Sequence, residues 1–366
     1  MDQPYHMLSY IHESPEALRL TLQVNEEQVK KIATDVTSRR IDKVVVAGLG
    51  SSYTAAMMAA PLFYLHCPFP CLVLNAEDTK YYADRWIDER SLVVVISRSG
   101  ERGAVVDTLK LANSKGALGV AVTGVADSLL AQNSRLTLVT QEGPEITFPK
   151  TKSVTTCAGM LMRLGLTLAD TIDQMAVQRN QMLTNAPDIL QKNIHAIEPR
   201  IKFLIPFITS HKNLNVVGSC SNYGVALEAA VKVQEASFIT TRGDSIAGLL
   251  QGPIGALNAD WLVVALAMAE DEVQIQELLK LLRDFGAHAM VVHPTGMDFS
   301  SYCDKSIILV EGQDPFLAAL QYLPVVQFMA YYWTVSRGMN PDEPSSMRKI
   351  LGSILPPGRQ EPELKK

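Results

Sequence analysis

Short, uninterrupted apolar runs alternate with longer segments of helical periodicity along most of the chain. In the first half these runs are Lys43–Ala47, Leu92–Ile96, Gly119–Val122 and Leu136–Val139. In the second half they are Asn215–Val217, Leu262–Leu266, Met290–Val292 and Ile307–Val310. The segments between them, such as Val105–Ala112, are long enough for helices. Continuous apolar strands that alternate with helices favour parallel sheets covered on both faces, so the pattern predicts an α/β fold.

The two halves of the chain repeat each other at a nearly constant spacing. An offset of 170 aligns Gly48-Leu49-Gly50-Ser51-Ser52-Tyr53 with Gly218-Ser219-Cys220-Ser221-Asn222-Tyr223, and Leu92-Val93-Val94-Val95 with Leu262-Val263-Val264-Ala265. Gly116-Ala117 aligns with Gly286-Ala287, and Leu138-Val139 with Leu309-Val310, at offsets of 170 and 171. Four alignments at almost one offset indicate that one α/β domain was duplicated.

The duplication divides the chain into five predicted segments. A helical lead-in occupies residues 1–34, with its helix expected over Ser14–Ala33. The two repeats occupy residues 35–170 and 206–340. A helical connector over 171–205 joins them, in a mostly helical stretch that we expect to break near Asn185-Ala186-Pro187. A proline-rich tail follows over 341–366.

The composition narrows the class of protein. The 366 residues are 47% hydrophobic and 19% charged, which is typical of a packed globular protein. A net charge of −5 gives no reason to expect a nucleic-acid partner. No signal peptide is evident, and no apolar stretch approaches the ~20 residues of a membrane span. Five scattered cysteines suggest reduced thiols in a cytoplasmic protein, and Cys67-Pro68-Phe69-Pro70-Cys71 lacks the second ligand pair of a metal site.

Small hydroxyl residues follow two strands of the first repeat. Gly50-Ser51-Ser52 comes after one strand and Ser97-Arg98-Ser99-Gly100 after another, where ligands bind in open α/β sheets. Glycine allows close backbone approach, helix N-termini direct N–H groups at anions, and Arg98 and Arg102 add positive charge. This combination suits a phosphate monoester, although serines at these positions also serve as helix N-caps.

The second repeat differs at the corresponding position. It has Met268-Ala269-Glu270-Asp271 there, which places carboxylates where an anion would bind. We therefore expect phosphate in the first repeat only. A dinucleotide site is the competing interpretation, because Gly48-Leu49-Gly50 begins a G-x-G-x-x-G motif. The motif is incomplete, since position 53 is tyrosine.

These loops resemble the phosphosugar-binding loops of SIS (sugar isomerase) domains. The resemblance extends to the segments Ile11–Pro15, Glu145–Thr156, Leu227–Glu235, Gly252-Pro253 and Asp342–Lys349. Over nearly its whole length the chain resembles tandem SIS proteins: the isomerase half of glucosamine-6-phosphate synthase and the fructosamine-6-phosphate deglycases. The resemblance implies two tandem SIS domains, each a parallel sheet between two layers of helices.

The resemblance also implies roles for individual residues. The sugar phosphate would be held by Gly50, Ser51, Ser52, Ser97, Arg98 and Ser99. Glu235 would be the base that moves a proton between C1 and C2, and Lys349 would contact the open-chain sugar and its developing oxyanion. Lys232, one helical turn before Glu235, would face the same site. No cofactor or metal is implied. The expected partner is a small phosphosugar, and the protein is expected to be a homo-oligomer, either a dimer or a dimer of dimers.

The sequence departs from the family pattern at several positions. The family has a histidine immediately before Gly252-Pro253, credited with ring opening or proton relay, whereas this chain has Gln251, which cannot shuttle a proton near neutral pH. Arg102 and Lys150 replace small hydroxyl residues, so they are possible substrate contacts that favour an acidic substituent. No nucleophilic cysteine follows Met1, so an amide-dependent synthase is not expected.

Two hypotheses follow. The first is an enzyme, either a fructosamine 6-phosphate deglycase or a ketose/aldose phosphate isomerase, favoured by Glu235 and Lys349. The second is a non-catalytic phosphosugar-binding protein or sensor, favoured by Gln251. The sequence does not specify the sugar or its aglycone.

Overall fold

The computed structural model describes residues 5–169, 173–310 and 314–343. Residue contacts divide the chain into two compact units. The amino-terminal unit contains Glu13–Ile146 and Lys152–Pro187. The carboxyl-terminal unit contains the described residues of 5–12, Thr147–Thr151 and 188–343. The boundaries of the five segments expected from the sequence remain a prediction.

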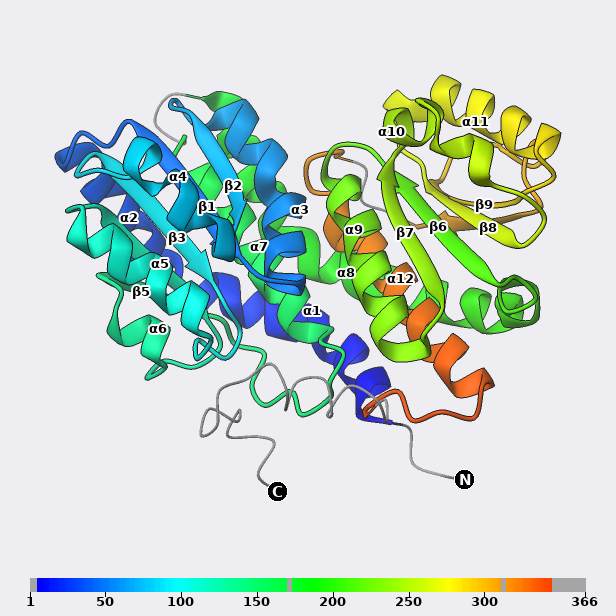
Figure 1. Cartoon of the computed structure of the whole chain (residues 1–366), viewed down its shortest axis with the longest axis horizontal. Coiled ribbons are helices and arrows are strands. Elements are labelled where there is room, and N and C mark those ends of the chain that lie inside the picture. Colours follow the sequence, from blue (N-terminus) through cyan, green and yellow to red (C-terminus); the bar gives the residue numbers. More distant parts are fainter. Residues whose placement is uncertain (1–4, 170–172, 311–313, 344–366) are drawn as a thin grey trace. The chain divides into compact units, whose positions relative to one another are not determined.

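The amino-terminal unit is built on a five-stranded parallel sheet in the order β2-β1-β3-β4-β5 (Figure 1). Its strands are β1 (Lys43–Gly48), β2 (Cys71–Asn75), β3 (Ser91–Ile96), β4 (Leu118–Thr123) and β5 (Leu136–Val139). Its helices are α2 (Glu26–Ser38), α3 (Ser51–His66), η1 (Ala76–Asp78), α4 (Thr79–Trp86), α5 (Gly103–Ser114), α6 (Leu129–Gln132) and α7 (Lys152–Thr167). Helix α1 (His6–Val24) precedes them.

The carboxyl-terminal unit repeats this topology, with the strand order β10-β9-β8-β6-β7 (Figure 1). Its strands are β6 (Asn213–Gly218), β7 (Thr240–Ser245), β8 (Trp261–Leu266), β9 (His288–Pro294) and β10 (Lys305–Leu309). Its helices are α9 (Ser221–Ser237), α10 (Ile246–Leu250), η2 (Pro253–Ala256), η3 (Ala269–Asp271), α11 (Glu272–Asp284) and α12 (Ala319–Ser336). Helix α8 (Gln174–Ile208) precedes them.

Each sheet is covered by helices on both faces. In the amino-terminal unit, Val45, Val93 and Ala121 face a core shared with α4, α5 and α6. Helices α3 and α7 pack on each other and contact β1, β2 and β4. In the carboxyl-terminal unit, α10 and α11 cover one face, while α9 contacts β6, β7 and α12. Three layers in each unit confirm the α/β fold class expected from the apolar runs and the resemblance.

The apolar runs did not reveal two strands. Strand β7 has the sequence Thr-Thr-Arg-Gly-Asp-Ser, which carries no apolar signal, and β2 is partly exposed along its whole length. Both lie at a sheet edge. Gly243 in β7 explains how this strand packs, because a Cβ there would lie 2.1 Å from the Ala226 carbonyl oxygen of α9.

The helices before each sheet also differ from expectation. The predicted single helix over Ser14–Ala33 is two helices, α1 and α2, separated at Asn25. The Asn25 side chain accepts a hydrogen bond from the Val139 N–H at 3.0 Å and donates to the Val139 carbonyl at 2.8 Å, so it satisfies the backbone at the end of β5. Asn193 has a comparable role in the second repeat, because its side chain accepts from the Val310 N–H at 2.9 Å, beside the end of β10.

The helix break expected near Asn185-Ala186-Pro187 is wrong. Helix α8 continues through Pro187, and the division between the two contact-defined units falls directly after it. An interior proline costs a helix about 3 kcal/mol. Buried apolar side chains on both sides of the proline, including Leu183 and Leu190, offset that cost.

Candidate functional site

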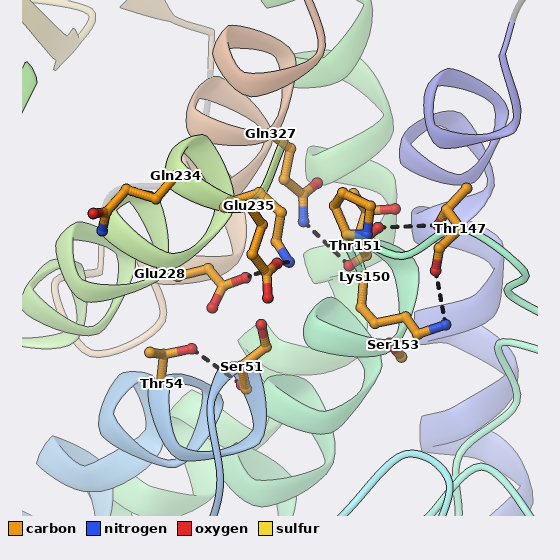
Figure 2. A network of polar contacts seen from close by, with 12 residues as sticks. Ser51, Thr54, Thr147, Lys150, Thr151, Ser153, Glu228, Gln234, Glu235 and Gln327 are labelled. Atoms are coloured by element: carbon orange, nitrogen blue, oxygen red, sulfur yellow. Dashed lines mark hydrogen bonds and ion pairs between the residues drawn. The ribbon is translucent and has the colours of Figure 1, made fainter. Parts of the chain in front are cut away.

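The loop after β1 brings a turn of backbone and two hydroxyl groups to the carboxyl end of the sheet. Gly50 has a φ of 52°, which glycine adopts readily, and α3 begins at Ser51. A Cβ on Gly48 would lie 2.8 Å from the Ser52 carbonyl carbon, so this tight turn needs glycine there too. Thr54 donates its hydroxyl to the Ser51 carbonyl at 3.0 Å (Figure 2). The predicted strand–turn–helix unit is therefore formed, with Ser51 and Ser52 partly exposed.

The loop after β3 is held by hydrogen bonds on both sides. Ser97 is only 7% exposed, its N–H donates to the Val122 carbonyl at 3.0 Å, and its hydroxyl accepts from the Gly100 N–H at 3.1 Å. Gly100 has a φ of 68°, and a Cβ there would lie 2.3 Å from the Ser128 hydroxyl oxygen. Ser99 lies in this fixed loop and is partly exposed. Helix α5 begins only at Gly103, so the loop is longer than the sequence motif suggested.

Strand pairing places the two loops side by side. Strands β1 and β3 are adjacent and parallel, with Gly48 opposite Ile96, so both loops leave the same edge of the sheet at the same level. Arg102 is exposed at the start of α5. Arg98 is directed toward the segment before α7, where its guanidinium donates to the Gly143 carbonyl at 3.4 Å. The amino-terminal unit thus groups the hydroxyl loops with two arginines.

The corresponding loop of the carboxyl-terminal unit keeps the backbone but uses its polar groups internally. Cys220 has φ 51° and ψ −127°, against 52° and −127° at Gly50. Ser221, the counterpart of Ser51, donates its hydroxyl to the Pro315 carbonyl at 2.6 Å and accepts from the Ala319 N–H. Asp271 is nearly buried, and burial raises the pKa of its carboxyl. At the offset of 170, Ala267 and Ala269 stand where the other unit has Ser97 and Ser99, so this loop lacks their hydroxyls, and Asp271 corresponds to Glu101.

Helix α9 carries a cluster of three charged side chains. The i, i+4 and i, i+3 spacings place Glu228, Lys232 and Glu235 on one helical face. The Lys232 ammonium lies 3.3 Å from a Glu228 carboxylate oxygen and 3.0 Å from one of Glu235. The side chains of Glu228 and Lys232 are fully buried, whereas that of Glu235 is 25% exposed. Figure 2 shows Glu228 and Glu235 extending from α9. Sequence analysis assigns no role to Glu228, although its spacing of four residues from Lys232 was the available signal.

The segment Thr147–Thr151 carries Lys150, whose ammonium donates to the Thr147 carbonyl at 2.8 Å (Figure 2). Two contacts within the carboxyl-terminal unit fix this segment. Gln327 of α12 donates to the Thr151 carbonyl at 3.1 Å, and the Phe148 N–H donates to the Asp342 carbonyl at 2.8 Å.

Gln251 and Lys349 are the remaining sequence-predicted residues. Gln251 is exposed and ends α10, where its N–H donates to the Ala247 carbonyl. Lys349 lies outside the described residues. Within residues 5–169, 173–310 and 314–343, no three His, Cys, Asp or Glu side chains are grouped so that they could hold a metal ion. In that same part of the chain no helix is long and apolar enough to cross a membrane.

Sequence analysis also missed Glu142, which lies three residues before Glu145, the first residue of the family-like segment Glu145–Thr156. Glu145 accepts from the Lys152 N–H at 2.8 Å and the Ser153 hydroxyl at 2.6 Å, so it caps α7. Glu142 is buried behind the Ser97–Gly100 loop. A charged residue three positions after an apolar strand was the only local signal for it.

Comparison with known proteins finds a matching domain family. The SIS domain family model matches residues 39–167 and 207–337. Glutamine–fructose-6-phosphate aminotransferases (isomerizing) from Pyrococcus horikoshii and Thermococcus kodakarensis are 27% and 28% identical over 95% of this chain. The chain spans only 57% and 58% of their lengths.

Solved structures show the same fold. The C-terminal domain of glucosamine-fructose-6-phosphate aminotransferase from Francisella tularensis has a TM-score of 0.82 at 22% identity, covering 93% of this chain and 99% of that one. Tagatose-6-phosphate ketose/aldose isomerase from Escherichia coli has a TM-score of 0.78 at 20% identity, covering 91% and 93%.

The strained turn at Cys220 yields a prediction. Positive φ at a residue with a Cβ costs on the order of 1–3 kcal/mol, and glycine relieves it at an entropic cost of about 0.5–1 kcal/mol. Cys220→Gly should therefore have a free energy of unfolding about 1 kcal/mol higher than Cys220→Ala, measured by urea titration. The reverse substitution Gly50→Ala should lower stability by a similar amount. Equal stability of the two Cys220 variants would contradict the assignment of strain to this turn.

Proposed function

Because the chain belongs to the SIS domain family, we propose that it is a phosphosugar-metabolising enzyme that transfers a proton between C1 and C2 of an open-chain sugar 6-phosphate. Its substrate would be a fructosamine (Amadori) 6-phosphate, which it deglycates, or a ketose or aldose phosphate, which it isomerises. The hydroxyl loops of the amino-terminal unit, with Ser51, Ser52, Ser97 and Ser99, would hold the phosphate. Glu235 would be the base.

The charged cluster on α9 is the observation that carries this proposal. Burying the Glu228 carboxylate and the Lys232 ammonium is costly, and apolar side chains of similar volume would stabilise the helix at least as well. The Lys232 ammonium holds the Glu235 carboxylate at 3.0 Å, and Glu235 alone of the three keeps an exposed part. A partly exposed carboxylate oriented by a buried cation is suited to general-base chemistry.

Both candidate reactions can be written with Glu235 as the base and water as the only other reactant. Glu235 would take a proton from the carbon beside the carbonyl, giving an enediol, or an enaminol when the substrate carries an amine. Returning that proton to the neighbouring carbon completes isomerisation. In a deglycase the returned proton leaves an imine at C1, water adds there, and the C1–N bond breaks to release the amine and an aldose 6-phosphate. Lys349 would stabilise the developing oxyanion.

Two departures from the family pattern favour the deglycase. Gln251 offers no group that could shuttle a proton during ring opening. Fructosamine 6-phosphates open more readily than aldose phosphates, so the deglycase reaction tolerates this loss better. Arg102 and Lys150 add positive charge, which favours a substrate with an acidic aglycone such as an amino-acid carboxylate.

The second candidate is a non-catalytic phosphosugar-binding protein or sensor. Gln251 favours it, because the side chain replaces the residue credited with opening the ring. The α9 cluster opposes it, because a binding protein needs no partly exposed base beside a buried ammonium. We also propose that the protein is a cytoplasmic homo-oligomer, a dimer or a dimer of dimers.

A substrate panel separates these functions. Purified protein would be incubated with 6-phosphorylated fructosamines that carry acidic, neutral and basic aglycones, and with ketose and aldose 6-phosphates. The deglycase proposal predicts release of glucose 6-phosphate and free amine, fastest with an acidic aglycone. Interconversion of ketose and aldose phosphates alone would favour the isomerase. Binding of several compounds with turnover of none would establish the sensor.

Glu235→Gln tests the catalytic assignment. The glutamine keeps the size of the side chain but cannot accept the proton, so we expect kcat to fall about 10²- to 10⁴-fold. Phosphosugar affinity should stay within a few-fold, because the base acts in the transition state. Glu277→Gln, the same change at an exposed position of α11, is the control and should have wild-type activity. Turnover by Glu235→Gln at the wild-type rate would refute the role of Glu235.

A further inference from the structure

Glu142 is a buried carboxyl group with one oxygen left unpaired. It lies between β5 and α7 and is only 2% exposed. One carboxylate oxygen accepts a hydrogen bond from the Thr156 hydroxyl at 3.1 Å. The other is buried and has no hydrogen-bond partner among the residues that the structure describes. A buried polar atom without a partner is costly, so it needs an explanation.

The unpaired oxygen lies directly behind the Ser97–Gly100 loop. A Cβ on Gly124 would lie 2.1 Å from it, so the carboxyl group packs against the Gly124 backbone. The Gly124 N–H donates to the Arg98 carbonyl at 3.0 Å, and the Thr123 hydroxyl donates to the same carbonyl at 3.2 Å. Only one glycine therefore separates the carboxyl group from the backbone of the loop.

Few charged or titratable groups surround Glu142. Arg98 approaches from the loop after β3, Glu145 from the segment before α7, and the Cys157 thiol from α7 itself. Burial is the largest influence and raises the pKa of Glu142, and the charge of Glu145 acts in the same direction, whereas the Thr140 side chain and Arg98 lower that pKa. Burial also raises the pKa of Cys157, so this thiol stays neutral. The carboxyl group is therefore easier to protonate than an exposed one.

We propose that Glu142 is a positioning residue that links phosphate binding at the Ser97–Gly100 loop to its own protonation. Ionised Glu142 places a negative charge behind the loop and draws the Arg98 guanidinium toward itself. Protonated Glu142 removes that charge and leaves Arg98 available to the phosphate. The inference rests on the proposed function only in requiring that this loop bind the phosphate of the substrate.

The sign of the effect follows from linkage. If the bound anion favours the protonated carboxyl, binding takes up a proton, and affinity falls as pH rises through the pKa of Glu142 in the free protein. A single linked proton limits the decline to about tenfold per pH unit. Glutamine at this position can keep the bond from Thr156 but cannot ionise, so it should remove the pH dependence.

The test uses sulfate, because its charge is constant over the range studied, whereas a phosphate monoester titrates near pH 6. Calorimetry would measure sulfate affinity of the full chain between pH 6 and 9. For the wild type we expect affinity to fall as pH rises through the pKa of Glu142, which burial raises, by no more than about tenfold per pH unit. For Glu142→Gln we expect constant affinity, as tight as that of the wild type below that pKa. A wild-type slope in Glu142→Gln would overturn the inference.

Two further variants make the result specific. Glu101→Gln changes a partly exposed carboxylate that accepts from the Leu129 N–H at 3.1 Å, and it should keep the wild-type pH dependence. Thr156→Val removes the hydroxyl that stabilises the charged form, so it should shift the decline to higher pH, which a merely structural role would not do. This shift also tests the inference if Glu142→Gln does not fold.

Ser97→Ala separates this inference from the proposed function. If the wild type binds sulfate and Ser97→Ala does not, the loop is the anion site, and the pH data then decide the role of Glu142. If Ser97→Ala binds as the wild type does, or the wild type binds neither sulfate nor a hexose 6-phosphate, the phosphate site itself is wrong. In that case the inference about Glu142 falls with it.

Discussion

The parallel pairing of β1 with β3 is the constraint on which the candidate phosphate site depends. Because Gly48 lies opposite Ile96, the turn at Gly50 and the loop beginning at Ser97 leave one edge of the sheet at one level. Neither loop alone surrounds an anion, since Ser51 and Ser52 begin a helix and Ser97 is nearly buried. Their pairing converts two ordinary strand ends into one group of hydroxyl and N–H donors.

The duplication shows how one backbone supports two kinds of chemistry. Gly50 and Cys220 have nearly the same φ and ψ. A Cβ added to Gly48 or to Gly218 would lie within 3 Å of the backbone that follows, so both turns need glycine at this position. Yet the hydroxyl of Ser221 is used to hold the start of α12, and Ala267 and Ala269 stand in place of Ser97 and Ser99. The carboxyl-terminal unit instead carries the charged cluster of α9, of which Glu235 is partly exposed. The repeat thus preserved the fold while the polar groups diverged.

Much of the fold could be predicted from the sequence, because buried parallel strands are continuously apolar and the offset of 170 marks the repeat. Strand β7 could not, since Gly243 and its polar neighbours are held by packing against α9 and pairing with β6 rather than by hydrophobicity. The continuity of α8 through Pro187 also depends on tertiary burial, which outweighs the local preference for a break.

The candidate site was predictable where its residues form local motifs, as at Ser51 and Ser97. Glu142 was not, because its environment is assembled from Gly124 and Thr156, which are distant from it in sequence. The direction of Arg98 toward Gly143 likewise depends on the fold. The roles of Glu235, Lys349 and Gln251 remain predictions that rest on resemblance and chemistry.

A crystal structure of the protein with a bound hexose 6-phosphate tests the central claim most directly. The account predicts phosphate density at the ends of β1 and β3, within hydrogen-bonding distance of Ser51, Ser97 and Ser99, and none at the corresponding ends of β6 and β8. Phosphate density beside Ser219 and Asp271 would contradict it.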